Sequence, residues 1–238
     1  MSLGTEHVKS SSTRRKKASR KRSSTTKLSR AQILKVALRL VRDEGLEKLT
    51  MRRLAEELGV ATMATYRHFK NRDELVIGMV DEVCRKRVGH TPPENATWQE
   101  QLTDQAQHAL QTFSQYKGLP TYIIKHGPHT KYGLRVIETW LQILIKAGFD
   151  YEESVYVFQS ICMQLASIVE FSTETDKAIW TYINVDKIDP EELDMLPLAK
   201  KSIRHFEHSR ESIFEWQMKT LIVALEKKLA DTKKPQKS

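Results

Sequence analysis

Two short helical patterns separated by Gly59 constrain the fold of this chain more than any other feature of its sequence. Thr50 is a good N-terminal cap for the first helix, and Gly59 ends it, because glycine easily adopts a left-handed backbone. After Val60, a second short helix is predicted from about Thr62 to Phe69. Two short helices joined by a glycine-containing turn are typical of a helix-turn-helix. The pattern therefore predicts this motif in the first third of the chain.

The residues that flank the motif predict a helix on either side of it. Ser29 and Gln32 form a capping-box pattern at the start of the preceding helix, and Gly45 supplies its C-terminal cap. Asn71 and Glu74 form a second capping box, which opens a longer helix after the motif. Apolar residues at helical spacing are expected to form the buried face of the preceding helix, namely Leu34, Ala37, Leu38 and Val41.

Composition and charge divide the chain into four segments. Residues 1–28 hold nine Lys or Arg residues against one Glu, out of a formal net charge of +9, and predict a disordered basic arm that seeks polyanions. Residues 29–90 form the predicted head with its connecting helix, and residues 91–230 form a predicted helical body. The polar residues 231–238 are predicted to be a disordered tail. The predicted fold class is all-α, with a three-helix head followed by a larger helical body.

The composition also excludes several classes of protein. With 39% hydrophobic and 29% charged residues the chain is typical of a soluble protein, and we expect no apolar run of the roughly 20 residues that span a bilayer. The polar, basic N-terminal stretch lacks the apolar segment of a secretory signal. The two cysteines, Cys84 and Cys162, do not suggest a disulfide framework. The predicted location is therefore the reducing cytoplasm.

The string LTMRRLAEELGVATMATYRHFKNRDEL, from Leu49 to Leu75, resembles the DNA-binding head of the TetR family. It carries the family's Leu-Thr-x-Arg-x-Leu-Ala start, its Leu-Gly-Val turn, and its Tyr-x-His-Phe exit before a Lys/Arg-Asp-Glu-Leu helix start. Two positions depart from the pattern, since Ala61 replaces a small polar cap and Thr65 replaces an aliphatic core residue. Because Ala61 offers no capping oxygen, Thr62 is the alternative cap one residue later. The resemblance implies a sequence-specific transcription regulator that recognises a double-stranded DNA operator.

The resemblance also implies which side chains contact DNA. The expected contacts are Thr50, Arg52, Thr62, Met63, Ala64, Tyr66, His68, Lys70 and Arg72. The three residues of the leading turn of the second helix have short or apolar side chains, which suit contact with thymine methyl groups. The tyrosine and histidine of the exit motif donate hydrogen bonds to phosphate oxygens in the family, and the neighbouring cations add positive charge.

Several of these residues also have a purely structural interpretation. Thr50 is explained equally well as a helix cap, whereas Arg52 has a planar fork that can read a guanine. Met63 would otherwise be a core residue. Lys70 and Arg72 would otherwise be ordinary solvated side chains.

Two segments of the body, 144–170 and 214–229, resemble the TetR-family region that builds the dimer. In the first segment, one apolar stripe comprises Tyr151, Val155, Phe158, Cys162, Leu165 and Val169. Other apolar side chains sit away from that stripe, namely Tyr156, Met163 and Ala166. One face can pack inward and the other against a partner. We therefore expect a homodimer, which matches a palindromic operator through its two-fold symmetry.

In the TetR family the body usually encloses a pocket for a small-molecule effector whose binding moves the two heads. The residues that could line such a pocket here are Trp98, Phe113, Tyr116, Tyr122, Trp140, Met163 and Trp180. Each of these is also explained by ordinary core packing. His126 lies near a region where the tetracycline-repressor branch has a ligand-contacting histidine, but the surrounding motif is absent. The resemblance implies a repressor that an effector releases, and it does not identify tetracycline or magnesium as ligands.

Two pairs of histidines are candidate metal ligands because the members of each pair are three residues apart. Gly127 and Pro128 interrupt the pair His126 and His129, whereas His205 and His208 lie on a polar stretch. We find no Gly-rich phosphate loop, nucleophile elbow or His-Glu-x-x-His motif. The sequence therefore predicts no enzyme, no cofactor, no metal site and no membrane partner. A metal-dependent hydrolase and a non-specific protein that binds polyanions through its basic arm remain the alternative classes.

Overall fold

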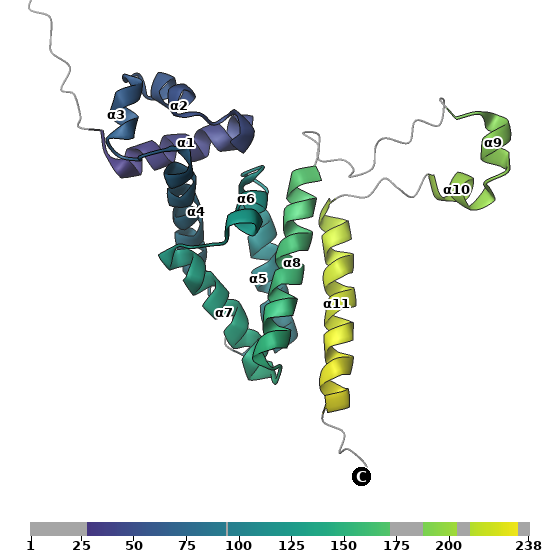
Figure 1. Cartoon of the computed structure of the whole chain (residues 1–238). Helices are drawn as coiled ribbons and strands as arrows, with labels where there is room; N and C mark the ends of the chain where they lie inside the picture. The colour runs from purple at the N-terminus through teal and green to yellow at the C-terminus, as the bar shows by residue number, and fades with distance from the viewer. Residues whose placement is uncertain (1–27, 94, 172–187, 204–209, 233–238) are drawn as a thin grey trace, which may run out of the picture.

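The computed structural model describes residues 28–93, 95–171, 188–203 and 210–232, which form helices and their connections and contain no strand (Figure 1). The first elements are α1 (Arg30–Glu44), the 3-10 turn η1 (Leu46–Lys48), α2 (Met51–Leu58), α3 (Thr62–Tyr66), α4 (Arg72–Val88) and α5 (Trp98–Phe113). They are followed by α6 (Leu119–His126), α7 (Lys131–Ala147), α8 (Tyr151–Phe171), α9 (Pro190–Asp194), α10 (Pro197–Ser202) and α11 (Arg210–Thr232). The all-α class predicted from the sequence is confirmed.

Several sequence predictions fall outside the described residues. They concern the basic arm over residues 1–27, Trp180, the histidine pair His205 and His208, and the last residues of the tail. These predictions stay as they were stated.

The head consists of α1, α2, α3 and the first turns of α4 (Figure 1). The predicted capping box of α1 is present, since the Ser29 hydroxyl accepts from the Gln32 amide and the Gln32 side chain accepts from the Ser29 amide. Gly45 and Gly59 end α1 and α2 with φ values of 84° and 65°. The buried face of α1 comprises Ile33, Ala37, Leu38, Leu40 and Val41, whereas Leu34 is only partly buried.

α3 is shorter than predicted, because it ends at Tyr66 rather than Phe69. The amides of His68 and Phe69 both donate to the carbonyl of Thr65, at 3.0 and 3.1 Å, so the chain tightens and leaves the helix there. Phe69 is fully buried, and the guanidinium of Arg30 lies 4.0 Å from the centre of its ring. The burial of Phe69 in the core of the head therefore determines where the chain leaves α3.

The second capping box also differs from the prediction. Asn71 accepts from the Glu74 amide at 2.8 Å, as expected of a cap. The Glu74 carboxylate, however, accepts from the amide of Lys70 at 2.7 Å, and no hydrogen bond returns it to Asn71. The Glu74 carboxylate thus stabilises the turn at Lys70, one residue before the cap Asn71.

α4 belongs to both the head and the body. It contacts α1 in the head and α5 and α7 in the body, and Figure 1 shows it running from one to the other. Its buried apolar side chains, from Leu75 to Cys84, lie in a hydrophobic core that is continuous from α1 to α11. A displacement of α4 therefore affects the packing of both parts.

A second contact joins the head to the body at Leu46. The Leu46 amide donates to the carbonyl of Lys117 at 3.1 Å. Gly118, the next residue, has φ 85°, and a Cβ atom there would lie 2.9 Å from the Cβ of Leu46. Only glycine allows so close an approach with this backbone conformation. The start of α6 is thus held directly against the head.

α8 is the one described helix that is long and apolar enough to cross a membrane, judged by length and composition alone. This differs from the expectation that no apolar run approaches such a length. α8 contacts α5, α6, α7 and α11, which is the packing of a central helix in a helical bundle.

The two faces of α8 are not divided quite as predicted. Its buried residues are Ser154, Val157, Ile161, Leu165, Ala166, Ile168 and Val169. Tyr151 and Val155 were expected to share the stripe of Leu165, yet both are exposed. Ala166, which was expected away from that stripe, is buried. α8 is contacted by four other described helices, and its own periodicity does not reveal which of its sides they cover.

Candidate nucleic-acid interface and body cavity

Thr65 lies on the side of α3 that faces the core of the head. This residue is fully buried, and its hydroxyl donates to the carbonyl of Thr62 at 2.7 Å. The internal hydrogen bond satisfies the hydroxyl, which explains how a threonine occupies an aliphatic position. Ala61 is the N-cap of α3 and makes no side-chain capping bond, so Thr62 is the first helical residue rather than the cap.

The outer side of α3 is exposed. Met63 is 70% exposed and Tyr66 is 42% exposed, whereas Thr62, Ala64 and the following His68 are half-buried. The core interpretation of Met63 is therefore wrong. A large thioether and a phenol held on the surface, next to small side chains, form a shape that can lie in a groove.

The N-terminal turn of α2 places Thr50 and Arg52 beside this surface. The Thr50 hydroxyl accepts from the Arg53 amide at 3.0 Å, which is the predicted cap. The Arg52 side chain is exposed and pairs with Glu56 at 3.0 Å across one helical turn. Such an exposed ion pair contributes little free energy, so Arg52 can leave Glu56 and pair with a DNA phosphate instead.

Arg72 is placed differently from the expectation. Its Nε donates to the carbonyl of Leu49 and its Nη2 donates to the carbonyl of Leu46, both at 2.8 Å. The guanidinium is thus turned toward η1 and the start of α2. Arg72 holds these elements together, whereas the neighbouring Lys70 is exposed.

Arg30 was missed by the sequence predictions. Its Nη1 donates to the carbonyl of His68 at 2.8 Å and to the carboxylate of Glu74 at 3.1 Å. The Lys70 amide and the Arg30 guanidinium hold the pKa of Glu74 below its usual value. Together these bonds fix the segment that follows α3. The two bonds of Arg30 join residues 38 and 44 positions apart, and no local spacing rule indicates them.

A second set of charges joins α1 to α2. Arg53 pairs with Glu44 at 2.6 Å and with Glu57 at 2.9 Å. The hydrogen bond from Arg53 lowers the pKa of Glu44. The pair of Arg53 and Glu57 is spaced by four residues, so helical spacing could have identified it.

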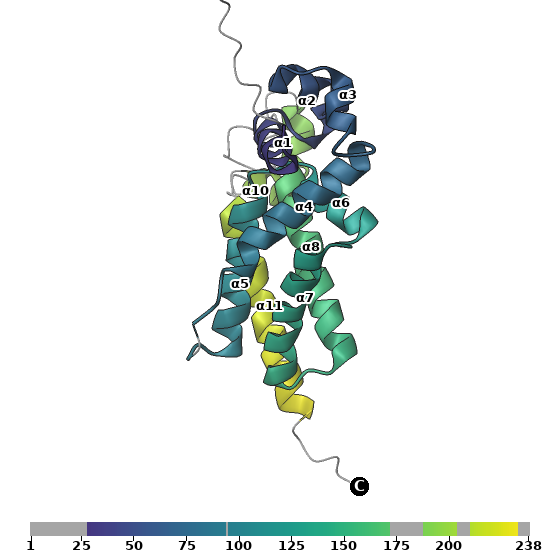
Figure 2. The same cartoon turned by 90° about the vertical axis from the view of Figure 1, so that its left-hand side faces the viewer.

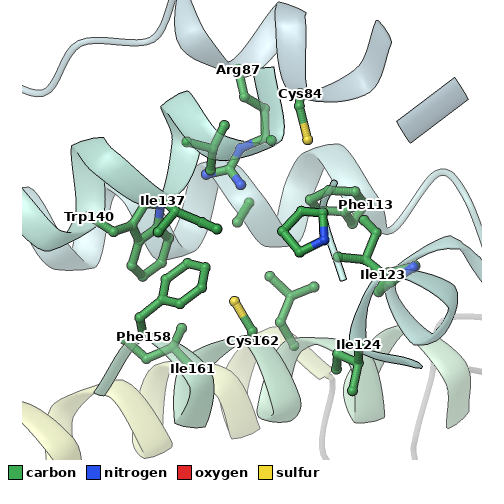
Figure 3. Close-up of a pocket in the computed structure, with 16 residues that line it drawn as sticks. Cys84, Arg87, Phe113, Ile123, Ile124, Ile137, Trp140, Phe158, Ile161 and Cys162 are labelled. Carbon is green, nitrogen blue, oxygen red and sulfur yellow. The ribbon is translucent and has the colours of Figure 1, made fainter. Parts of the chain in front are cut away.

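A cavity lies in the body between α4, α5, α6, α7 and α8. Its lining is Cys84, Arg87, Ala109, Phe113, Pro120, Ile123, Ile124, Pro128, Gly133, Val136, Ile137, Trp140, Phe158, Ile161, Cys162 and Leu165 (Figure 3). The inner space is about 70 Å³, and about 590 Å³ is free of atoms when the open mouth is included. The smaller value is the one to compare with the volumes of other cavities, because the larger one includes open solvent.

Two of the predicted pocket residues line this cavity, namely Phe113 and Trp140. The other described candidates, Trp98, Tyr116, Tyr122, His126 and Met163, do not. Trp98 packs edge-on against Phe149, with ring centres 5.6 Å apart. Tyr116 is buried beneath Arg42, whose guanidinium lies 5.9 Å from its ring centre.

Of the remaining candidates, Tyr122 is half-buried against the core, whereas His126 and Met163 are exposed. The ring of Tyr122 stacks on that of His126 at 4.3 Å, and His126 itself is exposed. Met163 is 57% exposed on α8. The aromatic residues were identified by type, whereas the side that each helix turns to the cavity decides which of them reach it.

Arg87 is the cavity residue that sequence reasoning missed. It lies in the last turn of α4, where a basic residue ordinarily faces water, yet its side chain is buried. Nη2 donates to the carbonyl of Gln105 at 3.2 Å, and Nε has no partner. Burial lowers the pKa of Arg87 below its usual value. The guanidinium points from α4 into the space near Ile137 and Trp140 (Figure 3).

The two cysteines face the same cavity. Burial raises the pKa of the Cys84 thiol to about 11 and that of the Cys162 thiol to about 12. Both thiols are therefore protonated at neutral pH, and neither has the thiolate character of a reactive cysteine. They contribute apolar surface to the cavity.

Exposed apolar side chains gather on α8 and α11, which lie alongside each other (Figures 1 and 2). The exposed apolar residues on these two helices are Tyr151, Val155, Tyr156, Met163, Phe171, Trp216 and Val223. Tyr151 is 77% exposed and Trp216 is 68% exposed. An ion pair between Glu153 and Lys228 links the two helices. We call these seven residues the apolar patch of α8 and α11. Large exposed apolar surfaces are rare on soluble monomers.

Within the described residues, no group of three or more His, Cys, Asp or Glu side chains is arranged to hold a metal ion. His126 and His129 lie at the end of α6 and in the loop before α7, on either side of Gly127. Gly127 has φ 75°, which breaks the helical spacing that the metal hypothesis required.

Two family models match the chain. The model described as bacterial regulatory proteins of the tetR family matches residues 33–79, and the model of the tetracyclin repressor-like C-terminal domain matches residues 91–179. The first range covers the head, and the second covers most of the body. Together they span more than half of the 238 residues.

Curated relatives agree with these matches. The chain is 24% identical over 152 residues to the class D tetracycline repressor of Escherichia coli, which covers 63% of this chain and 69% of that protein. It is 30% identical over 136 residues to the class C tetracycline repressor of Escherichia coli, which covers 57% and 62% respectively.

Solved structures share the fold. Apo ActR from Streptomyces coelicolor superposes with a TM-score of 0.70 at 22% identity, over 87% of this chain and 98% of ActR. ActR has also been solved in complex with actinorhodin, with a TM-score of 0.69 to this chain. BioQ bound to its double-stranded DNA operator has a TM-score of 0.52 at 21% identity, over 60% of this chain and 86% of BioQ.

Proposed function

Because the chain belongs to the TetR family of bacterial regulatory proteins, we propose that it is a repressor that binds a palindromic operator as a homodimer and leaves it when a small molecule occupies the body cavity. That it is a DNA-binding transcription regulator, and not an enzyme, follows from the family itself. The finer statements rest on the following observations.

The exposed face of α3 carries the proposal for DNA binding. Met63 and Tyr66 stay on the surface of a head whose other large apolar residues are mostly packed inside. In the proposed complex, Thr62, Met63 and Ala64 meet base edges, while Tyr66 and His68 donate to phosphate oxygens.

Further contacts come from residues beside α3. Thr50, Arg52 and Lys70 contact the phosphate backbone from the flanks of the head. Arg72 is excluded from the proposed set because two of its donors are used by the carbonyls of Leu46 and Leu49. The DNA-bound BioQ structure supports this use of the fold.

The exposed apolar patch on α8 and α11 supports the homodimer. A single α3 covers few base pairs, whereas two copies related by a two-fold axis read two half-sites. Packing α8 and α11 against their counterparts in a second copy would remove the patch from water and form a four-helix interface.

The position of α4 supports effector control. α4 begins in the head at Arg72 and reaches the cavity at Cys84 and Arg87. A ligand that fits the cavity in only one position of α4 shifts the balance between two arrangements of the heads. A coupling of about 1–3 kcal/mol would weaken operator binding by about 5- to 150-fold. ActR, which shares the fold, has been solved with the small molecule actinorhodin.

Selection of bound sites from random double-stranded DNA by the full-length chain tests the proposal. We expect enrichment of one palindromic sequence whose half-sites are about one helical turn or more apart. Retention of DNA without any sequence preference would contradict it and would favour a non-specific polyanion-binding protein.

A further inference from the structure

Arg87 is a buried charge without a counter-charge in its cavity. It is 6% exposed, and the residues that line the cavity with it include no carboxylate. Cys84 and Cys162, with pKa values of about 11 and 12, stay protonated and do not neutralise it. A buried cation is strongly destabilising unless an anion or a full set of hydrogen-bond acceptors surrounds it.

The acceptors that the protein supplies are incomplete. A guanidinium has five N–H donors. Nη2 bonds to the Gln105 carbonyl, and the guanidinium carbon lies 5.8 Å from the centre of the Phe113 ring, but the buried Nε has no acceptor. Trp140 lines the same cavity, and its buried indole Nε1 is also without an acceptor. Buried donors are rarely left unpaired in folded proteins, so two in one cavity indicate a missing partner with acceptor oxygens.

We propose that the effector is a lipophilic organic acid whose carboxylate pairs with Arg87 while its apolar part lies against Phe113, Ile137 and Phe158. This inference rests on the proposed effector site and names the class of ligand that it takes. A carboxylate suits the planar fork of arginine, since it accepts two parallel hydrogen bonds and supplies the charge. A bound water would satisfy Nε but would leave the charge uncompensated.

The shape of the cavity agrees with this class of ligand. The cavity volume of about 70 Å³ is smaller than a typical ligand pocket, and the wider space of about 590 Å³ includes open solvent. Apart from Arg87 and the two thiols, the lining consists of aliphatic and aromatic side chains, Pro120, Pro128 and Gly133. A small acid would therefore place its charged group at Arg87 and its hydrocarbon against the apolar lining.

Calorimetric titration of two probes of matched shape tests the inference. The probes are 1-naphthoate and the neutral 1-naphthalenemethanol, and the proteins are full-length wild type, Arg87→Met and Arg85→Met. Arg85 lies on the exposed side of the same helix, where it pairs with Glu82, so it controls for the loss of one positive charge. We expect wild type and Arg85→Met to bind the acid at least about tenfold more tightly than the alcohol, as one charge-assisted hydrogen bond provides. Arg87→Met should lose this preference and keep its affinity for the alcohol.

The outcomes separate the two claims. Equal binding of both probes to wild type, or an acid preference that survives in Arg87→Met, overturns the inference and leaves the cavity as an effector site. Equal binding of the two probes by wild type overturns the inference even if Arg87→Met fails to fold. Arg87→Lys, which keeps the charge but lacks the fork, is expected to bind the acid with intermediate affinity. Failure of both probes to bind wild type overturns the cavity as a ligand site, whereas the operator selection tests DNA binding independently.

Discussion

Tyr66 and His68 lie two positions apart at the exit of α3; Tyr66 is exposed, whereas His68 is half-buried. Tyr66→Phe removes a single oxygen, and His68→Ala removes the imidazole. If both donate to phosphate, each change should weaken operator binding by at least about tenfold without altering the fold, since a hydrogen bond to a charged group contributes about 1.5–3 kcal/mol. Titration against the selected operator measures this effect.

Tyr132→Phe is a matched control for that experiment. Tyr132 is half-buried at the start of α7, and it belongs neither to the cavity lining nor to the exposed apolar residues of α8 and α11. Operator affinity should be unchanged in this variant. Undiminished affinity in both Tyr66→Phe and His68→Ala would remove these residues from the proposed interface.

Arg72 provides a test that separates stability from DNA binding. Because its guanidinium donates to the carbonyls of Leu46 and Leu49, Arg72→Ala leaves two acceptors without their charged partner. We expect the free energy of unfolding to fall by about 2–3 kcal/mol, measured by urea denaturation. Arg67→Ala, at an exposed position nearby, should stay within about 0.5 kcal/mol of wild type. An equally small effect of Arg72→Ala would return its side chain to the candidates for phosphate contact.

Among the helices, those of the head were predicted best, because their ends depend on local chemistry. The caps at Ser29 and Thr50 and the glycines at 45 and 59 act on backbone groups within four residues. The end of α3 depends instead on Phe69 entering the core under Arg30, a contact between residues 39 positions apart. Such a contact has no signature in spacing, and the predicted helix was therefore too long.

The cavity was predicted less well for a related reason. Phe113 and Trp140 line it, but Met163 lies on the outside of α8. Residue type indicates that a side chain can form a pocket, whereas helix rotation within the bundle decides whether it does. Arg87 was missed for the opposite reason, because a charged side chain in the last turn of a helix indicates a surface position. Its burial depends on α5 and α7, which pack against α4.

Two glycines at the ends of helices allow a prediction about turns. Gly59 and Gly118 both have positive φ, but a Cβ would meet nothing within 4 Å at Gly59 and would lie 2.9 Å from Leu46 Cβ at Gly118. Gly59→Ala should cost about 1–2 kcal/mol of unfolding free energy, through the backbone alone. Gly118→Ala adds a clash and should cost about 3 kcal/mol or more. Equal losses in urea denaturation would mean that the head and α6 are not in tight contact.

For the whole molecule, the apolar patch on α8 and α11 predicts the state of assembly. The wild-type chain should sediment as a dimer at micromolar concentration, because the patch would otherwise be exposed. Trp216→Glu places a charge on the patch and should shift the equilibrium toward monomer. Lys35→Glu, at an exposed position of α1, serves as the control. A wild-type monomer under these conditions would contradict the proposed interface.

The basic segment predicts how salt affects the complex with DNA. Removing residues 1–27 should lower affinity for all DNA and leave the preferred sequence unchanged, because phosphate contacts carry little sequence information. Losing three contacts per protomer should flatten the slope of log K against log salt by about five units in a dimer. Equal slopes for the full-length and shortened chains would mean that the segment stays off the DNA.

The close approach of Leu46 to Gly118 limits how this protein can be recombined with its relatives. A chimera that joins a foreign head to this body at the end of α4 would place an unrelated side chain against a glycine that leaves no clearance. Residues 117 and 118 must therefore be transferred together with the foreign head. Otherwise the foreign head must carry, at the position of Leu46, a residue no larger than leucine. In biosensor engineering, the unit of exchange is the head together with the start of α6.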